Sequence, residues 1–283
     1  MTQTLVADDR ALDSSHDLAR TAPLQYVLRL ADNALILGQR NAEWCGHGPA
    51  LEEDIALANI SLDLIGQARL LYAHAGELEG RLTGRARQED EYAYWREERE
   101  FRNWTLLELP HTGPLAGTAR TERDYAVTIM RNFLYGALMA ALWPALETSQ
   151  DAGLAAIAAK SAKEARYHLQ HAAGWVMRLG DGTDASHVRM QRALDHLLPY
   201  MNECFAPDPV EQAAADQGVA VPTASLRDAW EAIVHATLED ATLRLPAPSA
   251  FVSTGKLGVH SEHMSYLLAE MQGLARAHPG AQW

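Results

Sequence analysis

Residues 51–80 read LEEDIALANISLDLIGQARLLYAHAGELEG, and this stretch decides the fold class. Its apolar side chains recur at helical spacing from about Leu51 to Leu78, and its acidic first turn suits the positive N-terminal end of a helix. A helix of this length exceeds the globular average, and its apolar stripe must be covered along most of its length. Antiparallel packing against other long helices provides that cover.

Helical periodicity continues on both sides of this stretch. One long helix is expected from Leu24 through LQYVLRLADNALILGQRNAEW, one from a cap at Thr121 or Asp124 to Leu146, and one from Asp151 to Gly180. Shorter helices are expected at about 89–107, 186–205, 226–243 and 260–277. Two long helices, a long connection and two more long helices predict an all-α, ferritin-like bundle with additional C-terminal helices.

The chain contains no sequence repeat and no linker long enough to separate two domains. Residues 1–22 show no sustained period and end before Pro23, so we expect a mobile N-terminal tail there. The remainder, 23–283, is predicted to form a single ferritin-like helical domain.

The charge balance limits the function. Of 283 residues, 24 are Lys or Arg and 37 are Asp or Glu, which gives a net charge of −13. Such a chain disfavours generic binding to nucleic acid or to anionic lipid. The apolar run FLYGALMAALWPAL (133–146) is shorter than a bilayer span, so we expect no membrane segment and a cytoplasmic location. Cys45 and Cys204 are expected to be reduced thiols and small core residues.

Many ferritin-like bundles hold two metal ions, with one Glu from each of two helices and a Glu-x-x-His pair from each of the others. That signature is missing from the long helices. The inward polar candidates on the 51–78 helix are Asp54, Asn59 and Asp63, and none is followed three residues later by a ligating side chain. Glu164 is followed by His168 at i+4, which shares its face. This pair stays open as a metal-binding alternative.

The other two long helices add little. The segment 127–146 has no carboxylate, and the first helix contributes Asp32 near its middle and Glu43 near its end. We therefore predict a bundle that lacks an intact di-iron site. The candidate ligands, which are Asp32, Asp63, Glu164 and His168, are interpreted as polar residues satisfied by hydrogen bonds or by cations such as Arg69, Lys163 or Arg166. The alternative is a self-contained di-iron oxidase or iron-binding protein in which these four still gather metal.

Other motifs have ordinary structural interpretations. His260 and His263 flank Glu262 at a helix start, where capping and surface exposure are favoured over metal binding. Neither cysteine has a nearby base in the sequence, and the stretches at 46–48 and 180–182 fit helix breaks better than phosphate loops. The tryptophans of the helical stretches, Trp104, Trp143, Trp175 and Trp230, are expected in the core.

Four longer blocks resemble a known family. They are EWCGHGPALEEDIALANISLDLIGQARLLYAHA (43–75), KEARYHLQHAAGWVMRLGDGTD (163–184), RDAWEAIVHATLEDATLRLP (227–246) and the terminal LLAEMQGLARAHPGAQW. They closely resemble the PaaC family, the C subunits of the bacterial phenylacetyl-CoA 1,2-epoxidase, over about 24–283. The chain departs from that family before Pro23 and around 113–123.

The resemblance implies a place in a multicomponent monooxygenase of aerobic phenylacetate catabolism, which converts phenylacetyl-CoA to its ring 1,2-epoxide with dioxygen. In that family the di-iron centre and the substrate pocket belong to the A subunit. A separate reductase with a flavin and an iron-sulfur cluster passes electrons from NADPH. The C subunit is a non-catalytic scaffold without iron ligands, so the resemblance assigns no catalytic, cofactor or metal residue to this chain.

The resemblance also implies partners, namely the A subunit and the remaining members of the complex, including the reductase. We expect the face formed by Glu43–Ala75 to contact the catalytic subunit, because its apolar pattern is wider than one core stripe requires. A homodimer is left open. A free-standing helical adaptor, with no affinity for an oxygenase, is a third class of function.

Overall fold

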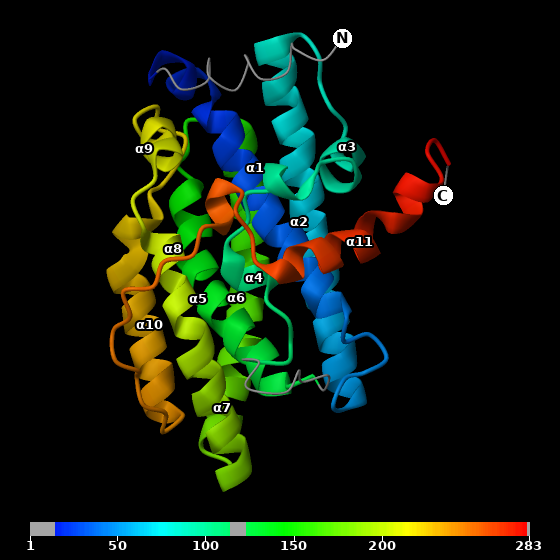
Figure 1. The fold of residues 1–283 in the computed structure, drawn as a ribbon. Coiled ribbons are helices and arrows are strands. Elements are labelled where there is room, and N and C mark those ends of the chain that lie inside the picture. Colours follow the sequence, from blue (N-terminus) through cyan, green and yellow to red (C-terminus); the bar gives the residue numbers. More distant parts are fainter. Residues whose placement is uncertain (1–14, 114–122, 282–283) are drawn as a thin grey trace.

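The computed structural model describes residues 15–113 and 123–281. Four long helices form a bundle: α1 (Ser15–Ala42), α2 (Leu51–Thr83), α5 (Tyr125–Leu146) and α6 (Ala152–Gly180). Helices α1 and α2 pack as one pair, and α5 and α6 pack as the other (Figure 1). The described residues form helices, turns and loops without a strand, so the all-α, ferritin-like prediction is confirmed.

Two helix starts follow the predicted caps. The side chain of Asp124 accepts from the amide of Ala126 at the start of α5, and that of Asp151 accepts from Leu154 at the start of α6. Thr121, the alternative cap for α5, lies outside the described residues. A capping carboxylate satisfies an amide that has no partner inside the helix. The sequence therefore placed the second helix pair correctly.

Helix α1 begins earlier than predicted. It runs from Ser15 through Pro23, so the expected boundary at 22/23 is wrong as the start of the folded chain. Ala22 is fully buried, and the Arg29 guanidinium lies 3.1 Å from Asp208 in the loop before α9 (Pro209–Ala215). Packing of the first turns against this C-terminal segment outweighs the hydrogen bond lost at proline. Residues 1–14 of the predicted tail lie outside the described residues.

The connection between the helix pairs is not the single helix predicted for 89–107. It forms α3 (Glu89–Tyr94), the 3₁₀ turn η2 (Glu98–Glu100) and α4 (Thr105–Glu108). Two of its backbone amides bind α1: Arg102 donates to Asp32 at 2.8 Å, and Trp104 donates to Asn33 at 2.8 Å. A continuous helix would have kept these amides in its own hydrogen bonds. Tertiary contacts with α1 therefore break the helix.

The C-terminal part packs around the bundle in shorter pieces (Figure 1). Its helices are α7 (Asp184–Leu197), α8 (Met201–Phe205), α9, α10 (Arg227–Asp240) and α11 (Glu262–Ala277), with 3₁₀ turns η3 (Leu198–Tyr200), η4 (Thr223–Leu226) and η5 (Gly255–Leu257). The predicted helix 186–205 is interrupted around Pro199, which has no amide hydrogen to continue the helix. The short helix α9 was not predicted.

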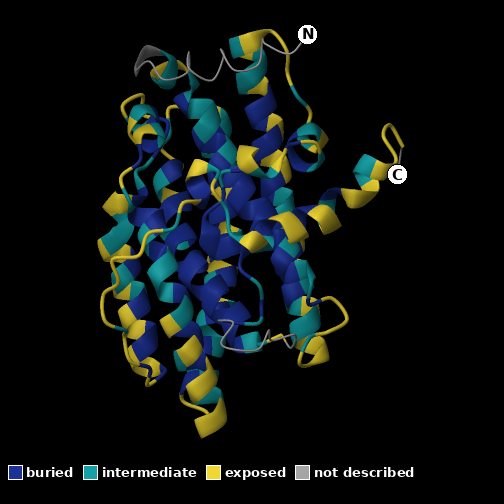
Figure 2. Cartoon of the chain, in the orientation of Figure 1, coloured by how far each residue is buried: buried dark blue, intermediate teal, exposed yellow. Residues whose placement is uncertain are grey.

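Buried residues fill the middle of the bundle (Figure 2). Helix α5 is long and apolar enough to cross a membrane by composition, but 89% of its most apolar window is buried inside the protein. It is therefore a core helix. Trp104, Trp143 and Trp230 are buried as predicted, and Trp175 is partly buried. Of the two cysteines, Cys204 is buried, whereas Cys45 is exposed and its core assignment is wrong.

His260 differs from the surface residue expected from the sequence. Its side chain is fully buried, with Nδ1 at 2.7 Å from Glu108 and Nε2 at 3.1 Å from the carbonyl oxygen of Phe101. Both ring nitrogens face acceptors, so the ring carries both protons. Burial acts against the charged ring, but the Glu108 hydrogen bond and charge outweigh it and raise the pKa of His260. This ion pair fixes the segment before α11 to α4.

We expect His260→Gln to destabilise the protein by about 1.5–3 kcal/mol at pH 6. A raised folded-state pKa contributes stability that is fully present below the ordinary histidine pKa and is lost as the pH rises through the folded value. The difference in unfolding free energy between wild type and variant should therefore shrink from pH 6 to pH 9, as measured by urea unfolding. His47→Gln, at an exposed position, is the control, and a difference that grows with pH contradicts the imidazolium assignment.

Candidate functional site at the bundle centre

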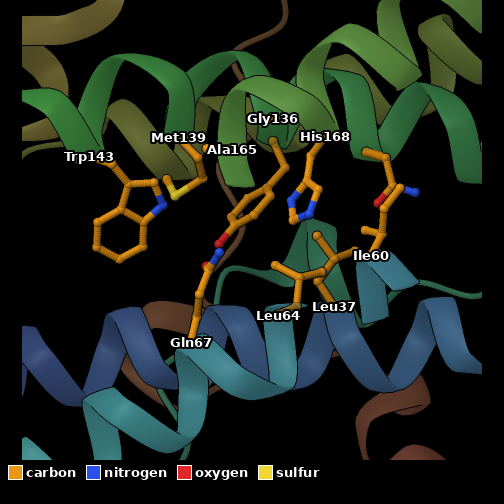
Figure 3. A pocket seen from close by; sticks show the side chains of 11 residues that line it. Leu37, Ile60, Leu64, Gln67, Gly136, Met139, Trp143, Ala165 and His168 are labelled. Atoms are coloured by element: carbon orange, nitrogen blue, oxygen red, sulfur yellow. The ribbon is translucent and has the colours of Figure 1, made fainter. Parts of the chain in front are cut away.

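The centre of the bundle is a narrow pocket between the α1–α2 pair and the α5–α6 pair (Figure 3). Its lining is mostly apolar and consists of Leu37, Ile60, Leu64, Tyr135, Gly136, Met139, Trp143 and Ala165. Three polar side chains complete it: Gln67, Asn132 and His168. Asn132 exchanges two hydrogen bonds with Asn41 of α1, at 3.0 and 3.2 Å. The centre therefore resembles a packed core with a polar side.

Two of these side chains, Gln67 and His168, belong to a series of four bridges between α2 and α6 with its N-cap, which we call the polar ladder. The bridges are Glu53–His171 at 2.9 Å, Asp63–His168 at 3.0 Å, Gln67–Glu164 at 2.8 Å and His74–Asp151 at 2.8 Å. Residue numbers rise along α2 as they fall along α6, so the two helices are antiparallel. The polar ladder joins one helix pair to the other.

The ladder is partly buried, and burial acts on the pKa values of its side chains. Burial lowers the pKa of His168, although the neighbouring Asp63 acts in the opposite direction. Burial alone would raise the pKa of Asp151, but the hydrogen bonds from His74 and from the Leu154 amide outweigh it and lower that pKa. Asp151 therefore caps α6 and binds α2 as a carboxylate.

Gly153 allows the bridge between His74 and Asp151. A Cβ atom at this position would lie 2.4 Å from Cε1 of the His74 ring. Any larger residue would push the imidazole away from the N-terminus of α6. The close approach of α2 to the first turn of α6 therefore requires glycine here.

The four candidate metal ligands do not all meet. Asp63 and His168 bind each other, and Glu164 binds Gln67 and lies 3.8 Å from Lys160. Asp32 lies in a different cluster, where it accepts from Tyr72, Arg96 and the Arg102 amide. Two of the cations predicted to pair with these candidate ligands bind elsewhere. Arg69 pairs with Glu89, and Arg166 donates to the Ala162 carbonyl.

The described residues near the pocket include fewer metal-ligating side chains than a ferritin-like di-iron centre uses. Such a centre takes four carboxylates and two imidazoles from four helices. Here α2 and α6 supply Asp63, Glu164 and His168 near the pocket, while α1 and α5 face it with side chains such as Leu37 and Asn132. Within 15–113 and 123–281, no group of three or more His, Cys, Asp or Glu side chains is arranged to hold a metal ion.

Sequence reasoning missed half of the ladder. Glu53, Gln67 and His74 were not among the inward candidates, while Asn59 is exposed and Asp54 accepts from the Gly48 amide. A signal was present, because 53, 67 and 74 are separated by multiples of seven and therefore share a helix face. A metal-ligand spacing of three residues within one helix does not reveal bridges that run between helices.

Comparison with known proteins identifies the family of this chain. The family described as "Phenylacetic acid catabolic protein" matches residues 6–283. This chain belongs to that family. It is also 46% identical over 258 residues to the C subunit of 1,2-phenylacetyl-CoA epoxidase from Escherichia coli (strain K12), with 91% of this chain and 98% of the relative covered. The resemblance to the C subunits that the sequence blocks indicated is confirmed.

Within this phenylacetic acid catabolic protein, the Asp32 cluster is a structural site. Asp32 is fully buried. The burial of Tyr72 and the neighbouring charge of Asp32 together raise the pKa of Tyr72 well above its ordinary value. The Tyr72 hydroxyl therefore stays protonated and donates a hydrogen bond to Asp32 at 2.6 Å. The carboxylate thus binds α2 through Tyr72 and the connection through Arg96 and Arg102.

We expect Asp32→Leu to lower the unfolding free energy by about 3–5 kcal/mol, because it leaves the buried Arg96 guanidinium without its carboxylate. The double variant Asp32→Leu/Arg96→Leu should recover much of this loss, since it removes both charges. Arg69→Ala, in the exposed pair with Glu89, should cost at most about 1 kcal/mol. Denaturant unfolding measures all three, and an equal cost for the single and double variants would contradict this account.

Proposed function

We propose that this chain is a non-catalytic, structural subunit of a cytoplasmic phenylacetyl-CoA epoxidase complex. The observation that carries the proposal is the 46% identity to a C subunit over almost the whole length of both chains. In the proposed complex, a di-iron A subunit epoxidises the aromatic ring with dioxygen. A flavin and iron-sulfur reductase delivers the electrons from NADPH.

The chemistry of the bundle centre supports a structural role. The polar ladder uses Asp63, His168 and Glu164 in bridges between α2 and α6, so these side chains already have hydrogen-bond partners. The pocket-lining side chains of α1 and α5 are apolar residues, the Asn132 amide and the Tyr135 phenol. Groups of this kind hold two helix pairs together and supply no ligand set for oxygen activation.

The outer face of α2 supports a protein partner. Leu51, Ile55, Leu62 and Leu70 are exposed along this helix, and Leu62 exposes 66% of its surface. Large apolar side chains repeated on one exposed helix face are typical of an interaction site. They lie within Glu43–Ala75, the range that the sequence analysis proposed as the partner face. We propose that this face is covered by the A subunit, with about 2,000 Å² or more buried in total.

A metal-free partner has a physical use. A catalytic bundle must admit substrate and oxygen to its metals, and the open space weakens its own packing. Docking against a bundle with a closed centre restores rigidity. Here the apolar lining around Leu64 and Trp143 and the polar ladder close that centre.

Leu62→Glu and Ile55→Glu should abolish co-purification with a co-expressed A subunit, because each places a charge in the proposed interface. Both positions are exposed, so the isolated variants should keep the wild-type melting temperature. Val188→Glu, at an exposed apolar position on α7, should leave the complex intact. If the α2 variants still form the complex, the partner face lies elsewhere.

Metal analysis tests the non-catalytic assignment. After anaerobic loading of the co-expressed complex with ferrous iron and separation of its subunits, we expect iron in the A subunit and negligible iron in this chain. About two irons per chain in this subunit would overturn the structural assignment in favour of a self-contained di-iron protein. Activity of each subunit alone provides the second readout.

A further inference from the structure

A second cavity lies away from the bundle centre, beside α10. It has a volume of about 170 Å³, opens to solvent on one side, and is lined by η3, α8, α10 and the segment 245–249. We call the segment 244–251 the strap, and Figure 1 shows it running along the outside of α10 and α8. Nothing in the proposed structural role uses this cavity.

The inner walls of the cavity are aromatic and apolar. Phe205 and Trp230 are buried, and their ring centroids lie 5.1 Å apart with planes tilted by 60°. Val234, Leu245 and Pro246 complete this part of the lining. The Trp230 indole N–H donates to the Leu134 carbonyl at 3.0 Å, so it is already satisfied by α5. These walls therefore present ring faces and methyl groups to a flat apolar ligand.

The strap is fixed at both ends. The Asn202 amide nitrogen donates to the carbonyl oxygens of Ser249 and Phe251, both at 2.9 Å. At the other end, Gln191 exchanges hydrogen bonds with the Arg244 backbone, at 2.8 and 2.9 Å. Pro246 and Pro248 stiffen the chain between these anchors. The cavity is thus preformed, which lowers the entropic cost of binding.

The mouth of the cavity is polar. Arg227, Glu231 and His235 line it, and the Arg227 guanidinium lies 4.5 Å from the centroid of the Phe205 ring. Its ion pair with Glu231 is long, at 3.5 Å, and the two side chains are 42% and 43% exposed. A pair of this kind is weak. A ligand carboxylate can therefore take the place of Glu231 on the guanidinium.

We propose that this cavity binds a monocyclic aromatic carboxylic acid, with the ring against the wall formed by Phe205 and Trp230 and the carboxylate on Arg227. The volume supports one ring, because an apolar cavity of about 150 Å³ is enough to bind benzene. Arginine supports the acid, because its planar guanidinium pairs with a carboxylate through two hydrogen bonds. The net charge of −13 gives an anion little attraction elsewhere on the surface.

The proposal is independent of the structural role in an epoxidase. It concerns ligand binding by this chain alone, and it assigns no chemical step to the cavity. A chain that fails to bind the acid can still assemble with an A subunit, and the reverse also holds. The two proposals therefore fail in different experiments.

Isothermal titration calorimetry of the full chain with phenylacetate, benzoate and toluene tests the proposal. We expect saturable binding of the acids at one site. Arg227→Gln should weaken the acids about tenfold and leave toluene within about twofold. Glu231→Gln should tighten the acids, because it removes the carboxylate that competes for Arg227 and repels the ligand. Arg69→Gln, far along α2, is the matched control and should change nothing.

Arg227 and Glu231 are half-exposed, so both variants should fold, which equal melting temperatures verify. Val234→Phe, which fills the cavity from α10, should abolish binding of the acids and of toluene together. No saturable binding of either acid to the wild-type chain overturns the proposal. Binding of the acids that is unchanged in both Arg227→Gln and Glu231→Gln also overturns the proposal. A structure of a complex in which only an apolar side chain of a partner protein fills the cavity overturns it as well.

Discussion

The buried carboxylate of Asp32 is the contact on which the rest of the arrangement depends. It lies in the middle of α1 with no exposed surface, and it binds the Tyr72 hydroxyl, the Arg96 guanidinium and the Arg102 amide. One carboxylate thus holds a neighbouring helix and the long connection in place. Because a charge at this depth is stable only with its full set of donors, the position of each donor is strongly restricted.

The interior of the bundle is of two kinds. Between α1 and α2 and around α5, close apolar packing dominates, with Leu37, Leu64 and Met139 in the centre. Between α2 and α6, histidine and carboxylate side chains form hydrogen-bonded bridges. In a catalytic ferritin-like bundle the corresponding space holds metals. Here the side chains of α2 and α6 bind one another across that space.

The sequence predicted the features that depend on local rules. The length of α2, the caps at Asp124 and Asp151, and the stop at Gly180 all follow from spacing and from the needs of helix ends. The sequence did not predict the break in 89–107, because that break depends on distant acceptors, Asp32 and Asn33.

The candidate site shows the same division. Asp63, Glu164 and His168 were correctly recognised as inward or polar positions. The pairing of Asp63 with His168 and of Glu164 with Gln67 was not predicted, because spacing within one helix does not show which residue on another helix is the partner. The burial of His260 and the exposure of Cys45 were missed for the same reason. Both are set by which loop happens to cover the position.

The last helix has a consequence for how the chain is made. Gln272 of α11 donates to the carbonyls of Ala93 and Arg96, and Arg276 donates to Tyr94, across 179, 176 and 182 positions of sequence. During translation these residues leave the ribosome after every other helix. The four long helices can assemble while synthesis continues. The backbone acceptors of the connection, however, stay open to water until α11 has been synthesised and can pack against them.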